Sequence, residues 1–279
     1  MTGFALLALL ASLFLGTSDF LGGTLSRRVP LLTVLLLSQL VGTLATLARL
    51  LFDEPGGEVG PALLWGAVGG LAVAAGVSSL YQALATGTMG VVAPVAALSV
   101  LVPAGAGILA GDPIGPLLAT GMVVAVAGTV LATGPELRTA RSAARPILLA
   151  LLSALGFGVS NLTVAWGSAH HVGATLLGNA LTALLVYVVI ALVRRHRPVA
   201  AGRQLVGIAA IGVLGFAANL CFALASRSGM LSVVAVFASL FPAVTALLGW
   251  RFHAERLAPV QVVGVLLVFA GVGVIAASS

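Results

Sequence analysis

Long apolar stretches follow one another along almost the whole chain, separated by short polar breaks. A window of about 20 apolar residues has the length that a helix needs to cross a bilayer. Ten such windows are predicted as membrane-spanning helices, at approximately 4–24, 31–51, 61–84, 89–109, 115–133, 147–168, 173–193, 205–226, 230–250 and 259–277. Several breaks are so short that the helices on either side are predicted to be antiparallel neighbours.

The second half of the chain repeats the polar pattern of the first half. Gly16-Thr17-Ser18-Asp19-Phe20 corresponds to Gly158-Val159-Ser160-Asn161-Leu162, 142 residues later. Each copy holds five windows, an odd number, so the second copy is predicted to cross the membrane in the opposite sense to the first. We therefore expect an all-α integral membrane protein of ten transmembrane helices, arranged as two inverted-topology repeats over residues 1–136 and 146–279.

Composition narrows the class of protein further. Hydrophobic residues make up 60% of the 279 residues, charged residues only 7%, and the mean hydropathy is +1.20, values that exclude an ordinary soluble domain. The basic excess comes from thirteen Arg in short loops, which indicates a membrane protein and not a nucleic-acid-binding protein. Eleven of them lie in the loops after windows 1, 5, 7 and 9, which predicts an inner-membrane protein with those loops cytoplasmic and both termini outside.

Asp19 is the only charged residue in the first apolar window. A carboxylate at the centre of a membrane helix costs about 2.5–3.5 kcal/mol on insertion scales, so something must compensate for it. One hypothesis is that Asp19 binds a cationic group of a substrate, or a proton that alternates with it. The alternative is a structural carboxylate paired with a nearby Ser, Thr, Arg27 or Arg28. The helix rise puts Asp19 and Asn161 roughly 8 Å and 5 Å from the midplane on opposite sides, one toward each gate.

Other polar residues at matching positions of the two repeats are predicted to share a cavity at the repeat interface. They are Gln39, Asn179, Ser79, Asn219, Tyr81 and Gln82. The alternative is that their side chains hold neighbouring helices together. Trp65 and Trp166 either line that cavity or anchor the helices at the membrane surface.

Small and cyclic residues suggest where helices pack or bend. Gly66 and Gly70, four residues apart, are predicted to form a helix contact face. Prolines inside windows 4 and 9 are candidate gating points, or simply packing kinks. They are Pro94, Pro103 and Pro242.

The chain resembles the drug/metabolite transporter superfamily, in its ten-helix EamA-type form. The resemblance lies in Gly16-Thr17-Ser18-Asp19-Phe20-Leu21-Gly22-Gly23, in Tyr81-Gln82-Ala83-Leu84 through Pro103, in Phe241-Pro242 with Ala254-Glu255-Arg256-Leu257, and in the glycine-rich run from Gly264 to Gly271. It covers nearly the whole chain in both halves. The resemblance implies a membrane transporter, in a family that includes exporters of amino acids, metabolites and drugs as well as exchangers.

These observations favour a secondary transporter of a small organic metabolite, amino acid-like or drug-like, that works by alternating access, with Asp19 as the candidate proton-coupling residue. The alternative within transport is an uncoupled uniporter or exchanger. An intramembrane enzyme is disfavoured because the windows offer a single carboxylate and no mid-window His for catalysis or metal binding. A non-transporting scaffold would not need matched polar residues. No catalytic residue, metal, cofactor or nucleic-acid partner is expected, whereas the lipid bilayer is; the oligomeric state, monomer or homodimer, is left open.

Overall fold

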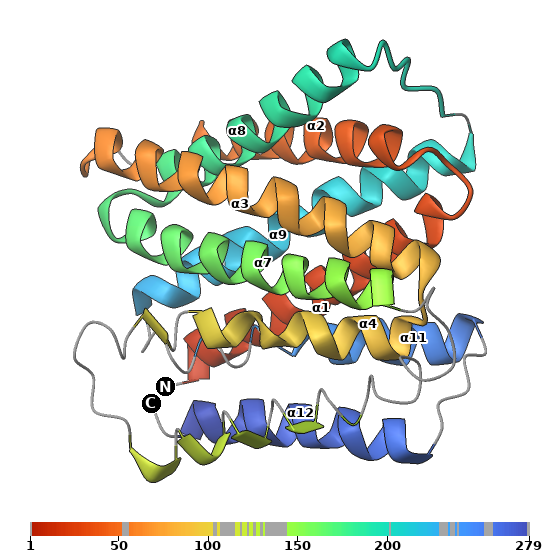
Figure 1. Ribbon diagram of the computed structural model, residues 1–279. Coiled ribbons are helices and arrows are strands. Elements are labelled where there is room, and N and C mark those ends of the chain that lie inside the picture. Colours follow the sequence, from red (N-terminus) through yellow and green to blue (C-terminus); the bar gives the residue numbers. More distant parts are fainter. Residues whose placement is uncertain are drawn as a thin grey trace.

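The computed structural model describes most of the chain. The described residues are 2–51, 56–102, 105–106, 115–117, 119–121, 123–124, 127–128, 131, 144–200, 202–228, 234, 238, 240–253 and 259–277. Every regular element within them is a helix (Figure 1). Pro103 and Glu255, which the sequence analysis named, lie outside these residues.

The helices follow the apolar windows closely. Their bounds are α1 Thr2–Ser26, α2 Leu31–Leu50, α3 Val59–Thr86, α4 Met89–Ala96, the 3₁₀ helix η1 Ala97–Val100, α7 Ala144–His170, α8 Val172–Val193, α9 Arg203–Ser228, α11 Phe241–His253 and α12 Pro259–Ala277. In the described part of the chain, α1, α2, α3, α7, α8 and α9 are long and apolar enough to cross a membrane. The count of ten spanning helices and the inverted repeat remain predictions.

The turn between α1 and α2 shows how local chemistry sets these bounds. Pro30 precedes α2 with φ −51° and ψ 128°, an extended conformation, and proline cannot extend the preceding helix. The Val29 amide instead donates to the Leu25 carbonyl, which satisfies the end of α1. Within a bilayer the remaining backbone groups must also be paired, and a continuous helix pairs them within itself.

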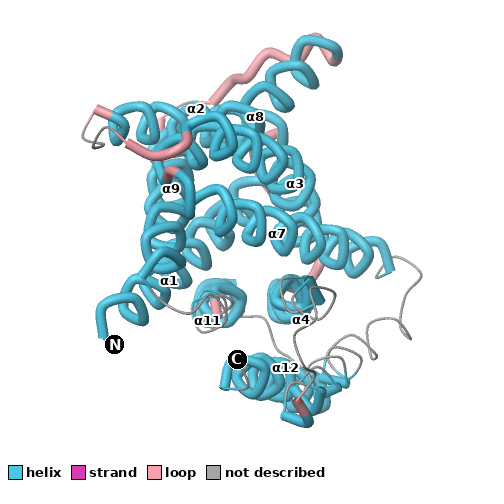
Figure 2. The backbone as a smooth tube through the Cα atoms, turned by 90° about the vertical axis from the view of Figure 1, so that its left-hand side faces the viewer, coloured by secondary structure: helices cyan, strands magenta, loops and turns pink. Residues whose placement is uncertain are grey.

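Six long helices form one group, and α4, α11 and α12 lie on one side of it (Figure 2). The most extensive packing within the group joins α3 to α7 and α8, and α1 to α9. In both views α4 and α11 lie side by side, between the six-helix group and α12 (Figures 1 and 2). These two helices contact α7 and α1, respectively.

Small residues permit the closest approaches within the group. A side chain on Gly66 would overlap the Thr175 carbonyl of α8, and one on Gly70 would lie 2.5 Å from the Asn179 carbonyl of the same helix. The two glycines therefore form the contact face against α8. On the other side of α3, Gly76 and Gly156 bring α3 and α7 together backbone to backbone.

The chain reverses direction between its two halves. We call the end of the bundle where α1 finishes at Ser26 and α7 begins at Ala144 the Arg-rich end, and the opposite end, where α7 finishes at His170, the terminal end. At the Arg-rich end Thr24 Oγ1 lies 2.9 Å from His253 Nε2, and Thr33 Oγ1 lies 2.8 Å from His196 Nε2. Arg27, which follows α1, donates to the Leu84 carbonyl near the end of α3, and a side chain on Gly87, which follows α3, would lie 2.8 Å from the Pro146 side chain at the start of α7. The end of α1 and the start of α7 therefore lie at the same end of the bundle, and the two helices run in opposite directions.

Charge is distributed unevenly between the two ends. The described Arg residues at the Arg-rich end are Arg27, Arg28, Arg145, Arg194, Arg195, Arg197, Arg203 and Arg251. Arg49 and Arg227 are the two described Arg at the terminal end. Assignment of the Arg-rich end to the cytoplasm follows from the positive-inside rule and stays a prediction.

Candidate functional site

A cavity of about 100 Å³ lies at the centre of the six long helices, and all six contribute to its wall. We call it the central cavity. Its polar lining residues are Ser18, Asp19, Ser38, Gln39, Thr46, Tyr81, Ser160, Asn161, Asn179 and Asn219. Apolar residues, including Phe157 and Phe216, complete the wall. A water molecule occupies about 30 Å³ of liquid, so the cavity has room for roughly three waters.

Most of the predicted binding residues meet in this cavity. Asp19, Asn161, Gln39, Asn179, Asn219 and Tyr81 line it. Ser79 and Gln82, which neighbour Tyr81 on α3, are not among its lining residues. The helix-rise estimate put Asp19 and Asn161 toward separate gates, whereas in this conformation both side chains line the same space.

Four hydroxyl residues of the lining were not predicted: Ser18, Ser38, Thr46 and Ser160. A signal existed for two of them. Ser18 and Ser160 occupy the same place in the repeated motif, directly before Asp19 and Asn161. Conservation of the hydroxyl between the two halves, while the next residue changes from Asp to Asn, could have marked both.

Asp19 is the centre of the site's electrostatics. It is 1% exposed, and its Oδ2 atom has no hydrogen-bond partner among the described residues. Arg27, proposed as a structural partner, donates from Nη2 to the Leu84 carbonyl at 3.0 Å. A buried polar atom left without a partner costs free energy, and such exceptions in a folded protein call for an explanation.

Tyr81 and Ser18 surround the carboxylate. Ser18 Oγ donates to the Ile211 carbonyl at 3.1 Å, and the Tyr81 side chain lies close to Ser18. Tyr81 also lies close enough to Asp19 for the two to interact electrostatically. The ring of Tyr81 covers Gly22, where any side chain would overlap it. Asp19 is thus held beside a phenol hydroxyl whose position depends on the small size of Gly22.

Amide side chains form the other half of the lining. Asn179 Nδ2 donates to Ser160 Oγ at 3.3 Å, Gln39 Nε2 to the Ala180 carbonyl at 3.2 Å, and Asn219 Nδ2 to the Gly215 carbonyl at 3.1 Å. An amide carries two donor hydrogens and an acceptor oxygen, so each of these bonds uses one donor. The amides therefore support the helix contacts while presenting polar atoms to the cavity.

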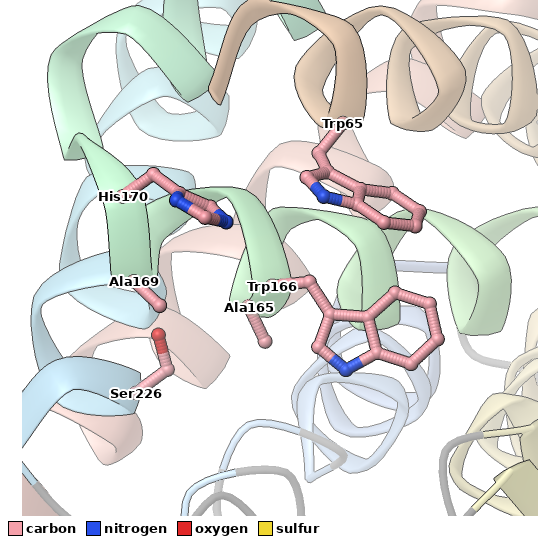
Figure 3. Close-up of a pocket in the computed structure, with 6 residues that line it drawn as sticks. All are labelled: Trp65, Ala165, Trp166, Ala169, His170 and Ser226. Atoms are coloured by element: carbon pink, nitrogen blue, oxygen red, sulfur yellow. The ribbon is translucent and has the colours of Figure 1, made fainter. Parts of the chain in front are cut away.

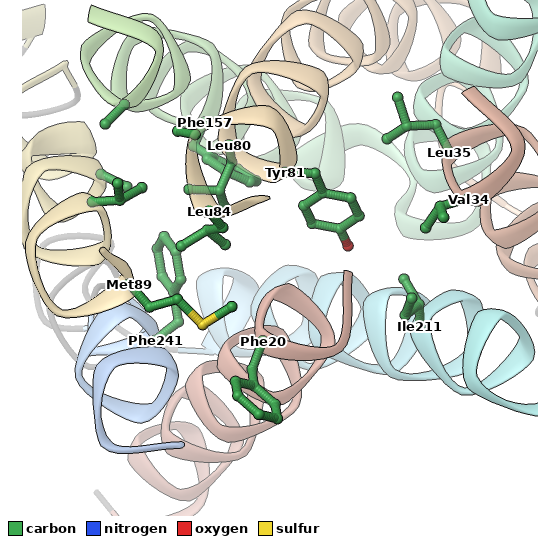
Figure 4. Close-up of a cluster of buried hydrophobic side chains, with 14 of the residues drawn as sticks. Phe20, Val34, Leu35, Leu80, Tyr81, Leu84, Met89, Phe157, Ile211 and Phe241 are labelled. Atoms are coloured by element: carbon green, nitrogen blue, oxygen red, sulfur yellow. The ribbon is translucent and has the colours of Figure 1, made fainter. Parts of the chain in front are cut away.

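Two packed apolar clusters adjoin the central cavity. One contains Phe20, Leu84, Met89 and Phe241 (Figure 4) and includes Tyr81, Phe157 and Ile211 of the cavity wall. Toward the terminal end, a second cluster joins residues of α1, α7, α8 and α9: Ala8, Ala11, Val164, Val172, Leu176, Phe222, Ala223 and Ala225.

The candidate gating prolines occupy different local settings. Pro94 lies within α4, shortly before the chain tightens into η1. Pro242 is the second residue of α11 and not an interior one, and proline is tolerated in a first turn because the amide it lacks has no helical acceptor there. Pro103 lies outside the described residues. Their role as gating points remains a prediction.

A second, larger pocket of about 390 Å³ lies at the terminal end, and we call it the vestibule. It is lined by Trp65, Ala165, Trp166, Ala169, His170 and Ser226 (Figure 3). Trp65 and Trp166 therefore line a pocket, but not the central cavity. Their ring centroids lie 5.0 Å apart at an interplanar angle of 67°. Among the described residues, no cluster of three His, Cys, Asp or Glu side chains could hold a metal ion.

Comparisons with known proteins agree with the helical architecture. One solved crystal structure of a protein superimposes with a TM-score of 0.66 at 19% identity, over 97% of this chain and 96% of that chain. At this identity the likeness shows a shared fold and no shared activity. A search of curated proteins found no match. Residues 144–277, just under half of the chain, match the model of the EamA-like transporter family, which is part of the drug/metabolite transporter superfamily.

Proposed function

We propose that the protein is a secondary transporter that moves a small organic metabolite, amino acid-like or drug-like, across the bacterial inner membrane by alternating access. In this proposal the central cavity is the substrate site, and Asp19 binds either a cationic group of the substrate or the proton that alternates with it. The observation that carries the proposal is the buried Asp19 Oδ2 atom, which has no partner among the described residues and belongs to a cavity-lining side chain. Ionisable groups within membrane segments are retained mainly where function needs them.

Packing in the two halves supports an inverted repeat. Helix α1 packs extensively on α9 of the other half, and its counterpart α7 packs extensively on α3. The repeated glycines behave in the same way. A side chain on Gly16 would overlap the Phe241 carbonyl, and one on Gly158 would lie 2.7 Å from the Ser99 carbonyl, so each glycine contacts the other half of the chain. Such exchange of partners is expected when the substrate site lies at the interface between inverted repeats.

The size of the central cavity supports a mechanism with moving helices. At about 100 Å³ it is well below the roughly 300–1,000 Å³ typical of small-molecule sites. A metabolite would fit only after the surrounding helices separate. Helix α11 must move together with α1, or lose its bond to it, because Thr245 Oγ1 of α11 donates to the Gly16 carbonyl of α1 at 3.0 Å. Substrate binding and helix movement are therefore coupled in this proposal.

A stability screen followed by transport measurements tests the proposal. Purified protein is mixed with amino acids, nucleosides, polyamines and amphipathic drugs, and the melting temperature is recorded for wild type, Asp19→Asn and Glu58→Gln. Glu58→Gln is the matched control, because it makes the same chemical change at a carboxylate that is 70% exposed. A ligand at 100 times its Kd should stabilise the folded protein by about 2.7 kcal/mol. We expect it to stabilise wild type and the control, but not Asp19→Asn.

A ligand that stabilises wild type but not Asp19→Asn is then tested for transport in proteoliposomes that contain a pH-sensitive dye. Coupled transport predicts substrate flux together with proton flux, both lost in Asp19→Asn. Substrate flux without proton flux, unchanged in Asp19→Asn, would instead identify the uncoupled uniporter or exchanger. Absence of flux for every ligand that binds would contradict the transport proposal.

A further inference from the structure

The vestibule lies in line with the central cavity. Along α7, Asn161 of the cavity is followed by Ala165 and Ala169 of the vestibule at intervals of four residues, which places all three on one helix face. Along α9, Asn219 of the cavity is followed two turns later by Ser226 of the vestibule. The two vestibule alanines are thus about 6 and 12 Å farther toward the terminal end than Asn161.

The vestibule has an aromatic wall, a narrow floor and a polar wall. Figure 3 shows Trp65 and Trp166 on one side, His170, Ala169 and Ser226 on the other, and Ala165 between them. Trp166 remains 43% exposed although its ring meets Trp65. The small floor residues leave a slot beside the indole rings. A tryptophan that only anchors a helix at the membrane surface needs no such slot or facing polar wall.

The polar wall favours a hydrogen-bond donor. Ser226 Oγ donates its proton to the Ala223 carbonyl at 2.9 Å, so its oxygen is left to accept a hydrogen bond from a ligand. Glu58 Oε2 lies 2.9 Å from His170 Nδ1, and Glu58 itself is not among the lining residues. Arg227 follows Ser226 on α9 but is not among the lining residues. Among the described residues, the lining contains no Arg or Lys side chain.

We propose that the vestibule is a binding site, separate from the central cavity, for arylalkylamines: molecules with a flat aromatic ring and a cationic amine head. The ring lies in the slot against Trp166, and the ammonium group donates to Ser226 Oγ. A volume of about 390 Å³ is within the range of small-molecule sites. The suggestion that such a ligand is on its way to the central cavity rests on the proposed transport function, but binding in the vestibule does not.

Tryptophan fluorescence reports on this pocket directly. The chain has three Trp residues, and two of them, Trp65 and Trp166, line the vestibule. The third, Trp250, belongs to α11 and is 62% exposed. The variant Trp250→Phe therefore leaves indole rings only in the vestibule. This variant is titrated with 2-phenylethylamine, 2-phenylethanol and phenylacetate, which share the ring and differ in the head. We expect a saturable change with the amine, and binding weaker by about tenfold or more for the neutral and anionic analogues.

Two further variants make the result specific. Ala169→Phe fills the slot at an exposed position and should abolish the saturable signal. Ser226→Ala keeps the slot but removes the acceptor, and should reduce the preference for the amine over the alcohol while the ring still binds. Melting curves for both variants check that they are folded. Equal binding of all three probes, or a non-saturable change that persists in Ala169→Phe, would overturn the proposal and indicate partition of the probes into lipid or detergent.

Asp19→Asn separates this proposal from the transport proposal. We expect 2-phenylethylamine to change vestibule fluorescence with an unaltered Kd in Asp19→Asn. Loss of the signal in that variant would place the binding event in the central cavity and overturn the vestibule site, while leaving the transport proposal intact. If 2-phenylethylamine still binds the vestibule but the protein transports none of its ligands, the vestibule site stands and the transport proposal is contradicted.

Discussion

Asp19→Asn replaces one carboxylate oxygen with an amide nitrogen and keeps the size of the side chain. In the wild-type protein Asp19 is 1% exposed, and Oδ2 has no partner among the described residues. A buried polar group without a hydrogen bond costs about 1–3 kcal/mol, and more when it is charged. A charged carboxylate costs more than this range, and because the amide of Asn also needs partners we expect only part of that larger cost to be recovered, a stabilisation of about 1–3 kcal/mol.

This stabilisation can be measured as a melting temperature. At about 2–4 °C per kcal/mol for a chain of this size, the apparent Tm should rise by roughly 2–12 °C. Transport should fall at the same time, since the group that binds the cation or proton is gone. A gain in stability together with a loss of activity is the expected signature of a residue kept for function.

Thermal unfolding in detergent and flux in proteoliposomes provide the two readouts. Glu58→Gln is the control, and its side chain is 70% exposed in a pair with His170, so its Tm should change little. The reasoning is refuted if Asp19→Asn melts at a lower temperature than wild type while flux and its pH dependence stay unchanged. That outcome would make Asp19 a structural carboxylate with a partner that its surroundings do not suggest.

Two further predictions follow from packing and charge. Gly22→Ala should destabilise the protein by about 1–3 kcal/mol, because the added methyl group overlaps the Tyr81 ring, whereas Gly60→Ala, with open space around it, should not; an equal Tm for the two variants would contradict the packing. The orientation can be tested with single cysteines in a Cys221→Ser background and a membrane-impermeant thiol reagent applied to intact cells. Arg28→Cys at the Arg-rich end should resist the reagent, and Gly60→Cys at the terminal end should react. The reverse pattern would place the Arg-rich end outside.

Hydropathy alone located the membrane helices well. The windows at 4–24 and 61–84 correspond to α1, Thr2–Ser26, and α3, Val59–Thr86. The observed helices are slightly longer because their last turns contain polar residues, which lower the hydropathy of a window but do not end a helix. Backbone pairing is obligatory in lipid, so a long apolar run has few alternatives to a helix.

Polar residues in the windows were found for a related reason. Asp19 and the amides Gln39 and Asn161 are costly in a membrane, so their presence in an apolar run is informative. Ser38 and Thr46 cost little free energy in a membrane, because each hydroxyl donates to a carbonyl of its own helix. Ser38 donates to Leu35 at 3.3 Å, and Thr46 donates to Gly42 at 2.9 Å. Such residues give no signal in the sequence and become visible only when a cavity is located.

Faces of the helices could not be deduced from the sequence. Tyr81 lines the central cavity while its neighbour Gln82 does not, and α3 is apolar around most of its circumference. Lipid is as apolar as a helix interface, so a membrane helix needs no apolar stripe to mark its buried side. Likewise, only packing decided that Trp65 and Trp166 meet in a vestibule apart from the cavity.

The sequence by itself determined that the chain is built from membrane-length helices, that its polar motif occurs twice, and that one copy carries the charge of Asp19 while the other carries the neutral Asn161. These properties follow from hydropathy and from the cost of polar groups in lipid, which act residue by residue. The tertiary structure decided that Asp19 and Asn161 line one small cavity that two apolar clusters adjoin. That arrangement depends on which helix surfaces approach one another. The choice of surfaces is determined by the close packing of many side chains at once.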